Sequence, residues 1–358
     1  MAQYILKRIF YGLLVLFGVI TVIFLLFNVL PGDPARMMLG QRADIASVEA
    51  INHDLGLDQS LPKQYLGFLN DLSPVSVHNY KNKPSFWYLD PEKYSYIVLF
   101  KLADQKIVLK KPYLRRSYQS KRKVSDILIE AFPNTMILAT VSILFAVIVG
   151  VFIGVIVAIN KNVFVERLAM FFSVLGMSLP SFFVAIIFAW IFAYLLGDLT
   201  GLNMFGSLKT VDDFGNGEYF DLKNLILPAI TLGIRPLAIV VELTKSSLQD
   251  VLSQDYIRTA KAKGLSASRI IRKHALKNAM NPVVTAVSGW FASLMAGAVF
   301  VEYVFDWKGV GVVIVKALEK YDFPVIMGSV LIISILLVII NIIVDVVYAM
   351  LDPRIKYT

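Results

Sequence analysis

The sequence contains no cysteine and is poor in histidine and in charge. Without cysteine among its 358 residues it can form neither disulfides nor thiolate metal sites. Its three histidines, His53, His78 and His274, lie far apart, so a zinc or iron centre would need carboxylates for nearly every ligand. We therefore expect no metal and no cofactor. Only 17% of the residues are charged, against about a quarter in a typical soluble protein.

Long apolar runs take the place of the missing charge. Hydrophobic residues make up 57% of the chain, and the mean hydropathy is +0.67. A run of about 20 apolar residues can cross the hydrocarbon core of a bilayer. Six segments reach that length, at about 9–30, 133–159, 167–197, 225–249, 279–301 and 324–350. The sequence predicts an all-α polytopic membrane protein with six transmembrane helices.

The charges between these segments predict the orientation of the chain. The first segment follows Lys7 and Arg8 directly and is too long for the apolar region of a signal peptide, so we expect it to be retained. The stretch from Tyr256 to Pro282 holds seven Lys or Arg residues and no Asp or Glu, whereas the links 198–224 and 302–323 hold five basic and nine acidic residues. By the positive-inside rule, both termini and the basic stretch are cytoplasmic.

This orientation gives the chain an enlarged extracytoplasmic segment after the first helix. Within it, "SYIVLFKLADQKIVLKK" from Ser95 to Lys111 has two β-rich runs around a short polar turn and predicts a hairpin. The expected domains are a first transmembrane helix at 1–30, an extracytoplasmic segment at 31–132, a five-helix core at 133–350 that contains a cytoplasmic loop at 254–278, and a cytoplasmic tail at 351–358.

Gly264 interrupts the basic stretch. A glycine just past a helix end can adopt the left-handed conformation that closes the helix, so we expect a helix from Tyr256 to Lys263. Ser266 suits the N-cap of a second helix through "SRIIRKHALKNAM". Two interpretations remain open: a basic helix against anionic lipid headgroups, or a rigid corner that projects into a partner protein.

Several motifs resemble permease subunits of ATP-binding-cassette importers, in particular the B-type permease of the peptide and nickel branch. "RTAKAKG" followed by "RKHALKNAMNPVVT" is similar to the cytoplasmic EAA loop of that family. The blocks that match elsewhere are "FNVLPGDPA", "LGLDQSLPKQYLGFL", "FPNTMILA", "GMSLPSFF", "VEYVFDWKGVGVVIVKAL", "YDFPVIMGSVL" and "NIIVDVVYAMLDPRIKY". Residues from about 74 to 122 match no block and are interpreted as an insertion.

The resemblance implies a non-catalytic permease subunit of an ATP-driven importer in the bacterial inner membrane, with peptides as the expected cargo. The partners would be a second homologous permease, two ATPase subunits and an extracytoplasmic substrate-binding protein, with no nucleic acid. The 256–275 loop would be the coupling helix that docks on an ATPase. The coupling residues it implies are Arg258, Thr259, Ala260, Ala262, Gly264, Leu265 and Ser266, of which the first three replace the general consensus Glu-Ala-Ala.

Other residues carry weaker signals. Arg235 lies within the fourth apolar segment, where a charge is costly and usually faces a cavity, partner or pathway. Glu242 and Lys245, three residues apart, are expected to pair. Gly289, Ser293 and Gly297 recur every fourth residue, which suits close helix packing or a moving interface. Pathway residues are therefore predicted at Arg235, Ser293 and Gly297.

Asp33 follows the first helix, where the prolines at 31 and 34 favour a structural exit from the membrane over a substrate contact. Trp307 has the position of an interfacial anchor, and residues 308–320 are expected to form a short helix on the outer face.

Two other classes of function fit the residues less well. An intramembrane serine enzyme would need a base within reach of Ser178, and no histidine lies in an apolar segment. A self-contained secondary transporter for a small polar solute is the alternative, but coupling to protons or sodium would require more ionisable residues near the midplane. The chain also has no phosphate-binding loop, since Ser207 stands where "GLNMFGSL" would need lysine.

Overall fold

The computed structural model describes residues 2–29, 49, 52, 56–83, 85–160, 162–211 and 217–351. It divides into two compact units. The helical unit comprises Met1–Leu13, Ala131–Val312 and Ile333–Thr358, and the mixed unit comprises Leu14–Glu130 and Val313–Ile332. Each unit is described by itself.

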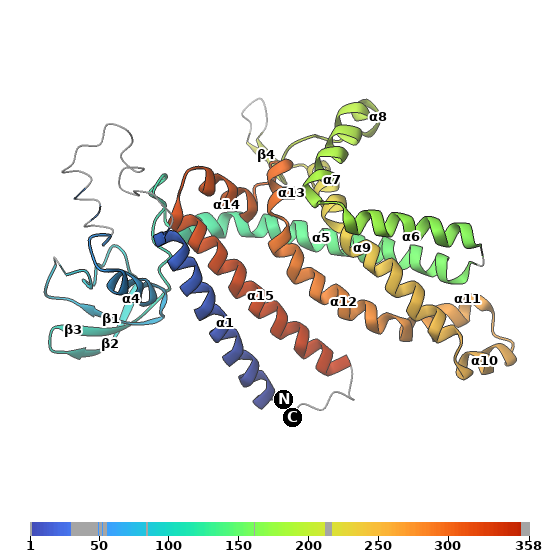
Figure 1. The fold of residues 1–358 in the computed structure, drawn as a ribbon, viewed down its shortest axis with the longest axis horizontal. Coiled ribbons are helices and arrows are strands. Elements are labelled where there is room, and N and C mark those ends of the chain that lie inside the picture. The colour runs from blue at the N-terminus through green and yellow to red at the C-terminus, as the bar shows by residue number, and fades with distance from the viewer. Residues whose placement is uncertain are drawn as a thin grey trace. The chain divides into compact units, whose positions relative to one another are not determined.

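Helices dominate the chain (Figure 1). The long helices are α1 (Ala2–Val29), α5 (Val124–Ile159), α6 (Val163–Ser178), α9 (Lys223–Leu252), α12 (Leu276–Gly297) and α15 (Phe323–Leu351). The shorter ones are α4 (Leu61–Leu72), α7 (Ser181–Phe188), α8 (Gly197–Thr200), α10 (Asp255–Ala262), α11 (Ala267–Arg269), α13 (Val299–Val304) and α14 (Val310–Glu319). Two segments have wider π-type turns, η1 (Ala189–Leu195) and η2 (Ile270–Ala275).

Four of the described helices are long and apolar enough to cross a membrane. They cover Leu6–Phe27, Val124–Ile159, Lys223–Leu252 and Phe323–Val346. A fifth span results if α6 and the helix that follows it, which are bent by 109°, count as one. The chain is thus a mostly helical, multi-span membrane protein, as predicted in outline.

The segment predicted at 167–197 is not one straight helix. It is broken between Ser178 and Ser181, where Leu179 has an extended backbone with ψ of 136°. The cause is Pro180, because a proline ring disfavours the helical conformation of the residue before it.

The helical unit is packed around α9. Gly150 and Gly154 of α5 face α9: a Cβ on Gly150 would lie 2.8 Å from Val240 Cγ1, and one on Gly154 would lie 2.6 Å from Thr244 Cβ. Glycines four residues apart let two helices approach closely without a side chain between them. Buried residues of α5, α7, α9, α12 and α13 form the main apolar core.

The chain is mostly helical, and the mixed unit adds a three-stranded β-sheet to the predicted helices. Strands β1 (Val75–Asn79), β2 (Tyr96–Leu102) and β3 (Gln105–Lys110) form an antiparallel sheet in the order β1-β3-β2. The predicted hairpin is confirmed as β2 and β3, which turn at Ala103 with φ of 48°. Strand β1 was not predicted. A second, two-stranded sheet in the helical unit pairs β4 (Lys209–Val211) with β5 (Glu218–Phe220).

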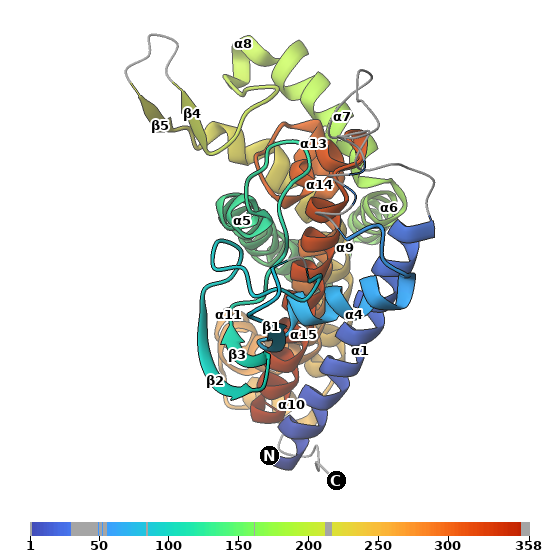
Figure 2. The same ribbon diagram turned by 90° about the vertical axis from the view of Figure 1, so that its left-hand side faces the viewer.

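Within the mixed unit, α4 crosses the second half of α1 (Figure 2). The ring of Phe68 stacks on Phe24 at 5.9 Å, and the hydroxyls of Thr21 and Tyr65 lie 2.6 Å apart. The segment after β3 is tied to the start of α15 by Asp322, which is buried. Its carboxylate accepts from the backbone N–H of Tyr118 at 2.9 Å and from the hydroxyl of Ser117 at 2.5 Å.

Candidate functional site

The corner after α10 is closed by hydrogen bonds around Gly264. This residue has φ of +73°, the left-handed conformation that the sequence predicts. Its N–H donates to the Lys261 carbonyl at 3.0 Å, and the Leu265 N–H donates to the Ala260 carbonyl at 3.3 Å. This pair of bonds is a Schellman motif, which satisfies the last carbonyls of a helix and fixes the direction in which the chain leaves it.

An apolar cluster holds this corner against the long helices. Its buried members come from α9, α10, η2 and α12 and are Leu248, Ile257, Ala260, Ile270, Ala275 and Ala279. Leu265 packs against the cluster from beyond the corner. Burial of an isoleucine side chain stabilises the folded state by roughly 1.5–3 kcal/mol. The buried Ile257 and Ile270 therefore anchor the corner to α9 and α12. Ala260, predicted as a coupling residue, is only 7% exposed and belongs to this anchor.

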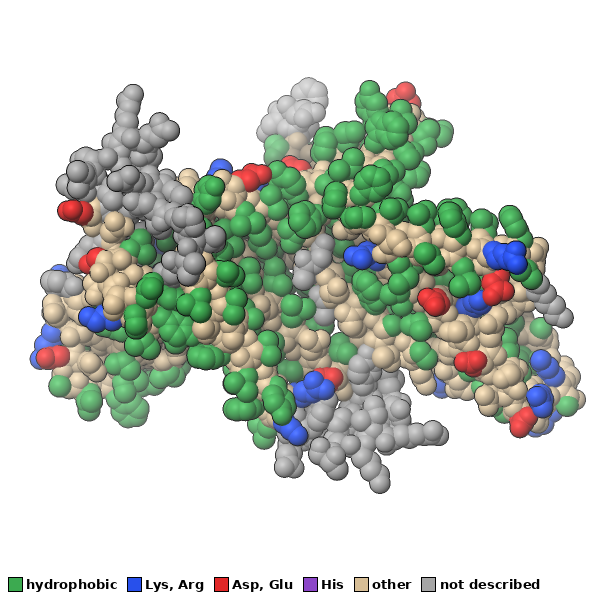
Figure 3. Space-filling model, viewed as in Figure 1, with side chains coloured by type: hydrophobic (Ala, Val, Ile, Leu, Met, Phe, Trp, Pro, Cys, Tyr) green, Lys and Arg blue, Asp and Glu red, His purple; other side chains and the backbone are tan. Residues whose placement is uncertain are grey.

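The other face of the corner is exposed. Of the predicted coupling residues, Arg258, Thr259, Ala262, Gly264 and Ser266 are exposed and Leu265 is half-buried. Basic side chains gather at this end of the helical unit, near α10 (Figure 3). Arg258 lies 3.3 Å from Asp255, but both side chains are more than 70% exposed, so the pair contributes little to stability. Ser266 is at the N-cap position as predicted, without a capping bond from its side chain.

The second helix of the basic stretch differs from the prediction in one respect. Helix α11 begins after Ser266 and continues through η2 into α12 without a break. The corner is therefore joined to α12 by unbroken helix. Pro282 lies inside α12.

Arg235 is exposed and contacts the broken helix. Its Nη2 lies 3.5 Å from the carbonyl oxygen of Met177, in the last turn of α6. Backbone carbonyls at a helix C-terminus attract cations, which gives this intramembrane charge one polar neighbour. Helix α9 continues through both Pro228 and Pro236.

The prediction that Lys245 pairs with Glu242 is wrong. Its Nζ lies 2.5 Å from Glu166 Oε1, on α6. The Lys245 side chain is 16% exposed and that of Glu166 is 41% exposed. Glu166 stands in the first turn of α6, where an acidic side chain also favours the helix dipole. The pair joins α6 to α9 at the end nearer the corner.

The predicted small-residue stripe of α12 has different surroundings from that of α5. A Cβ on Gly289 would meet no atom within 4 Å, and Ser293 is exposed. Gly297 is the last residue of α12. The face of α12 that carries Gly289 and Ser293 is therefore open in the described part of this chain, while other residues of the same stretch, such as Leu294 and Met295, pack in the main core. Asp33 lies outside the described residues.

A carboxylate that the sequence did not single out lies just beyond α12. Glu302 is fully buried, and its Oε2 accepts from the Gly311 N–H at 2.7 Å. Burial raises the pKa of this carboxyl to about 7, while the Thr135 hydroxyl and the N–H groups of Gly311 and Val312 act in the opposite direction. The sequence signal that could have pointed to this buried carboxylate is "KGVG", because Gly309 and Gly311 have no side chains and leave room for it.

Trp307 is not the exposed interfacial anchor that was predicted. It is fully buried, and its indole N–H donates to the Asn134 carbonyl at 2.9 Å. A tryptophan is buried readily where its N–H finds an acceptor. The short helix predicted at 308–320 is confirmed as α14.

Comparison with known proteins accounts for most of the chain. Residues 1–83 match the family model "Binding-prot-dependent transport system membrane comp, N-term", and residues 150–357 match "Binding-protein-dependent transport system inner membrane component". The stretch 84–149 lies between the two matches and overlaps the predicted insertion.

Individual relatives extend the match end to end. The glutathione transport system permease protein GsiC of Escherichia coli (strain K12) is 35% identical over 357 positions that cover 100% of both chains. Its counterpart from Pectobacterium atrosepticum is 34% identical with the same coverage.

Among solved structures, the inward-facing MetNI methionine ABC transporter aligns with a TM-score of 0.51 at 16% identity. The alignment covers 64% of this chain and 97% of that one, and it shows a shared fold.

These findings confirm the predicted resemblance and the predicted role as an importer permease. The family model alone spans more than half of the chain, and the relatives match over its full length. The four to five candidate spans agree with the location that the family description prints. The chain belongs to the family of binding-protein-dependent transport system inner membrane components, as a multi-pass permease subunit of the bacterial inner membrane.

Proposed function

We propose that this permease forms half of the pathway of an ATP-driven importer for di- and oligopeptides, and that its 256–275 element transmits the motion of an ATPase subunit. The observation that carries the proposal is the corner at Gly264, which is anchored to α9 and α12 and exposed on its other face. A partner pressing on the corner would displace the ends of two long helices together.

The coupling residues then divide into two groups. Ala260 and Leu265 hold the corner to the apolar cluster, while the exposed group meets the ATPase. The exposed group consists of Arg258, Thr259, Ala262, Gly264 and Ser266. ATP hydrolysis belongs to the partner subunits in this proposal, which makes this chain a non-catalytic subunit.

We place six spans in the membrane, with both termini and the 254–278 loop in the cytoplasm. The four apolar helices supply four of them, and the bent α6 pair supplies another. The sixth is α12, whose 22 residues are long enough to cross the hydrocarbon core. The segment 31–132, with the insertion at about 74–122, then lies outside the cytoplasm, and the basic side chains around the corner support this orientation.

A second, homologous permease would complete the pathway as a heterodimer. The support for a contact on α12 is the open space at Gly289 and the exposed Ser293, because small residues allow another helix to approach closely in lipid. Two ATPase subunits would dock on the cytoplasmic side, and a substrate-binding protein would deliver cargo from outside.

Peptide cargo is supported by the relatives and by Arg235. The GsiC proteins are named for transport of glutathione, which is itself a tripeptide. Arg235 places a cation on the exposed side of α9, where it could hold the free carboxylate of a peptide in transit, together with pathway residues at Ser293 and Gly297. A guanidinium pairs with a carboxylate through two parallel hydrogen bonds.

The test is to purify the tagged chain in mild detergent, identify the proteins that accompany it, and reconstitute the assembly in liposomes. We expect a second permease and ATPase subunits in stoichiometric amount, and uptake of tri-alanine that requires both ATP and the binding protein. A chain that purifies alone and transports solute without ATP would instead be a secondary transporter, and the proposal would be wrong.

A further inference from the structure

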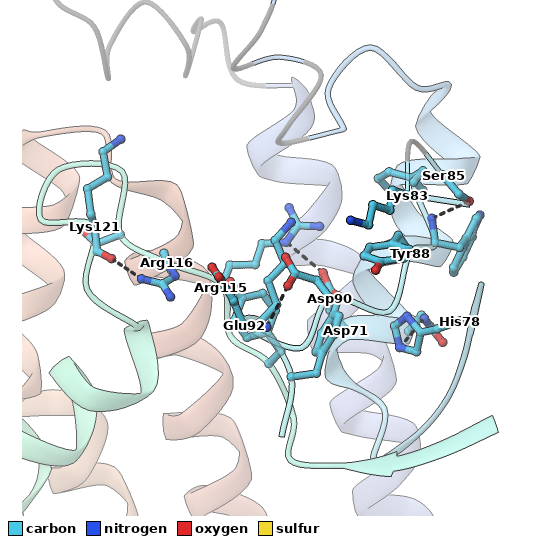
Figure 4. Close-up of a pocket in the computed structure, with 18 of the residues that line it drawn as sticks. Asp71, His78, Lys83, Ser85, Tyr88, Asp90, Glu92, Arg115, Arg116 and Lys121 are labelled. Atoms are coloured by element: carbon cyan, nitrogen blue, oxygen red, sulfur yellow. Dashed lines mark hydrogen bonds and ion pairs between the residues drawn. The ribbon is translucent and has the colours of Figure 1, made fainter. Parts of the chain in front are cut away.

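The mixed unit contains a cavity of about 650 Å³, and all the residues that line it belong to that unit. Its walls come from α4, β1, the connection between β1 and β2, and the segment after β3 (Figure 4). Pockets that bind small molecules have volumes of about 300–1,000 Å³, so this cavity is large enough for a short peptide.

The inner wall of this cavity is held together by hydrogen bonds and an ion pair around Asp71. Asp71 accepts from the Tyr94 hydroxyl at 2.7 Å and from Arg115 Nε at 3.3 Å, so the carboxylate and the guanidinium offset each other's charge. The Lys110 ammonium donates to the Asp71 backbone carbonyl at 2.5 Å. The ring of His78, which is 2% exposed, lies 4.8 Å from that of Tyr94.

His78 and Tyr94 keep their neutral forms near pH 7. Burial, followed by the charge of Lys110, lowers the pKa of His78 to about 4, against smaller opposing effects of Asp71 and the Trp87 carbonyl. Burial and the neighbouring Asp71 raise the pKa of Tyr94. The inner wall thus presents aromatic rings and a paired carboxylate, which suits the uncharged middle of a ligand.

The rim of the cavity carries both signs of charge with an excess of cations. Asp90 and Glu92 lie between Lys83 on one side and Arg116 and Lys121 on the other (Figure 4). Lys93 also lines the cavity, which makes four rim cations against two rim carboxylates. Within the described part of the chain, no salt bridge to Lys83 or Lys93 is found, so their ammonium groups are available to a ligand.

We propose that this cavity binds a short zwitterionic peptide, with the peptide's free carboxylate held by Lys83 and Lys93 and its amino group held near Asp90 and Glu92. The uncharged middle of the peptide then lies against the aromatic wall that includes Trp87 and Tyr94. The choice of a peptide over other carboxylates rests on the proposed function. The cavity is a peptide site of the permease itself, additional to any on the binding protein.

The experiment measures binding to the assembled complex in lipid nanodiscs, with the substrate-binding protein left out because that protein would capture the same ligand. Calorimetry measures the binding of four probes: tri-alanine, tri-alanine C-terminal amide, N-acetyl-tri-alanine and succinate. A fluorescence change that disappears in a Trp87→Phe variant would place the ligand at this cavity, since the chain has only four tryptophans.

We expect tri-alanine to bind, the amide to bind at least tenfold more weakly, and the acetylated form a few-fold more weakly. The double variant Lys83→Gln/Lys93→Gln should weaken tri-alanine binding at least tenfold. Lys101→Gln, which removes an exposed lysine of β2 outside the cavity, is the matched control and should change binding less than twofold. Succinate should bind at least tenfold more weakly than tri-alanine.

Equal binding of succinate and tri-alanine would overturn the assignment to peptides, and the absence of tri-alanine binding would overturn the site. These outcomes are separable from the proposed function. A complex that imports tri-alanine with its binding protein but shows no binding without it leaves the importer assignment standing and removes only the cavity. A complex that binds tri-alanine at this cavity but transports none would leave the cavity site standing and overturn the importer assignment.

Discussion

Gly264 in the corner after α10 has open space around it, whereas Gly311 at the start of α14 is enclosed. A Cβ on Gly264 would meet no atom within 4 Å, yet its φ of +73° is one that side chains disfavour. A Cβ on Gly311 would lie 2.5 Å from Val299 Cα, while its backbone is not left-handed. The first position requires glycine for its conformation and the second for the room it leaves.

The difference extends to what each region can do. The corner is exposed, and only its inner side is packed, so it can transmit a push from a partner. The turn at Gly309 and Gly311 encloses the buried carboxylate of Glu302 and holds the start of α14. We expect substitutions in the corner to affect transport more than stability, and substitutions in the enclosed turn to affect stability first.

The largest effect is expected at the enclosed turn. Gly311→Ala should lower the free energy of unfolding by about 3 kcal/mol, because the new methyl group would overlap backbone that cannot move aside. For Gly309→Ala, the three atoms nearest to the new methyl group all belong to the carboxylate of Glu302. Thermal unfolding in detergent, followed by tryptophan fluorescence, would measure both.

A double-mutant cycle separates the two glycines. In a Glu302→Ala background, the cost of Gly309→Ala should fall to less than half, while that of Gly311→Ala should remain, since Val299 is still present. Equal relief at both positions would show that Glu302 alone crowds this turn, and the distinction between the two glycines would fail.

The second prediction concerns pH. Because the pKa of Glu302 is raised from 4.5 to about 7, the folded protein holds a proton that the unfolded chain has released between these values. The stability that this proton contributes is fully present below about pH 4.5 and is lost as the pH rises through 7. For this shift the loss is about 3 kcal/mol.

The matched variant is Glu302→Gln, which keeps an acceptor for the Gly311 N–H and cannot titrate. Its unfolding temperature should vary less between pH 5 and pH 8 than that of the unaltered protein. An identical pH profile in both proteins would mean that Glu302 stays ionised in the folded state despite its burial.

The sequence predicted the corner better than the enclosed turn, and the reason is physical. Gly264 acts through local backbone conformation and is followed by an N-cap residue, and both signals lie within a few positions in sequence. Glu302 acts through space and is recognised only when α13 and α14 meet. The same limit explains why the hairpin of β2 and β3 was predicted while β1 was missed, since β1 joins β3 across more than 25 residues of chain.

Tertiary contacts overruled two further expectations. Trp307 was assigned to the membrane interface by residue type, but a carbonyl acceptor from Asn134 allows it to be buried. Lys245 has Glu242 within reach on its own helix, yet it pairs with Glu166 on a neighbouring one. In each case the partner that determines the side chain's position belongs to a segment far away in the sequence, so a local sequence pattern does not include it.

The third prediction tests the corner. Gly264→Val should reduce ATP-dependent uptake at least tenfold, because a β-branched residue resists the left-handed conformation by about 1–2 kcal/mol and alters the Schellman motif. Gly264→Asn should retain most uptake, since asparagine tolerates this conformation. Gly197→Val, at a glycine that also has open surroundings but no left-handed backbone, is the control. Comparable losses in the valine and asparagine variants would show that the conformation of residue 264 is not what matters.

The smallest effect is expected at the exposed ion pair between Asp255 and Arg258 in the corner. Asp255 and Arg258 lie 3.3 Å apart, with side chains 93% and 75% exposed, so water and salt screen their attraction. Asp255→Ala should change the free energy of unfolding by less than about 0.5 kcal/mol. If Arg258 meets an ATPase, Arg258→Ala should instead weaken ATPase retention on a tagged complex while leaving the unfolding temperature unchanged. Equal effects of the two substitutions on retention would mean that the pair acts as a unit, and that Arg258 alone is not the contact.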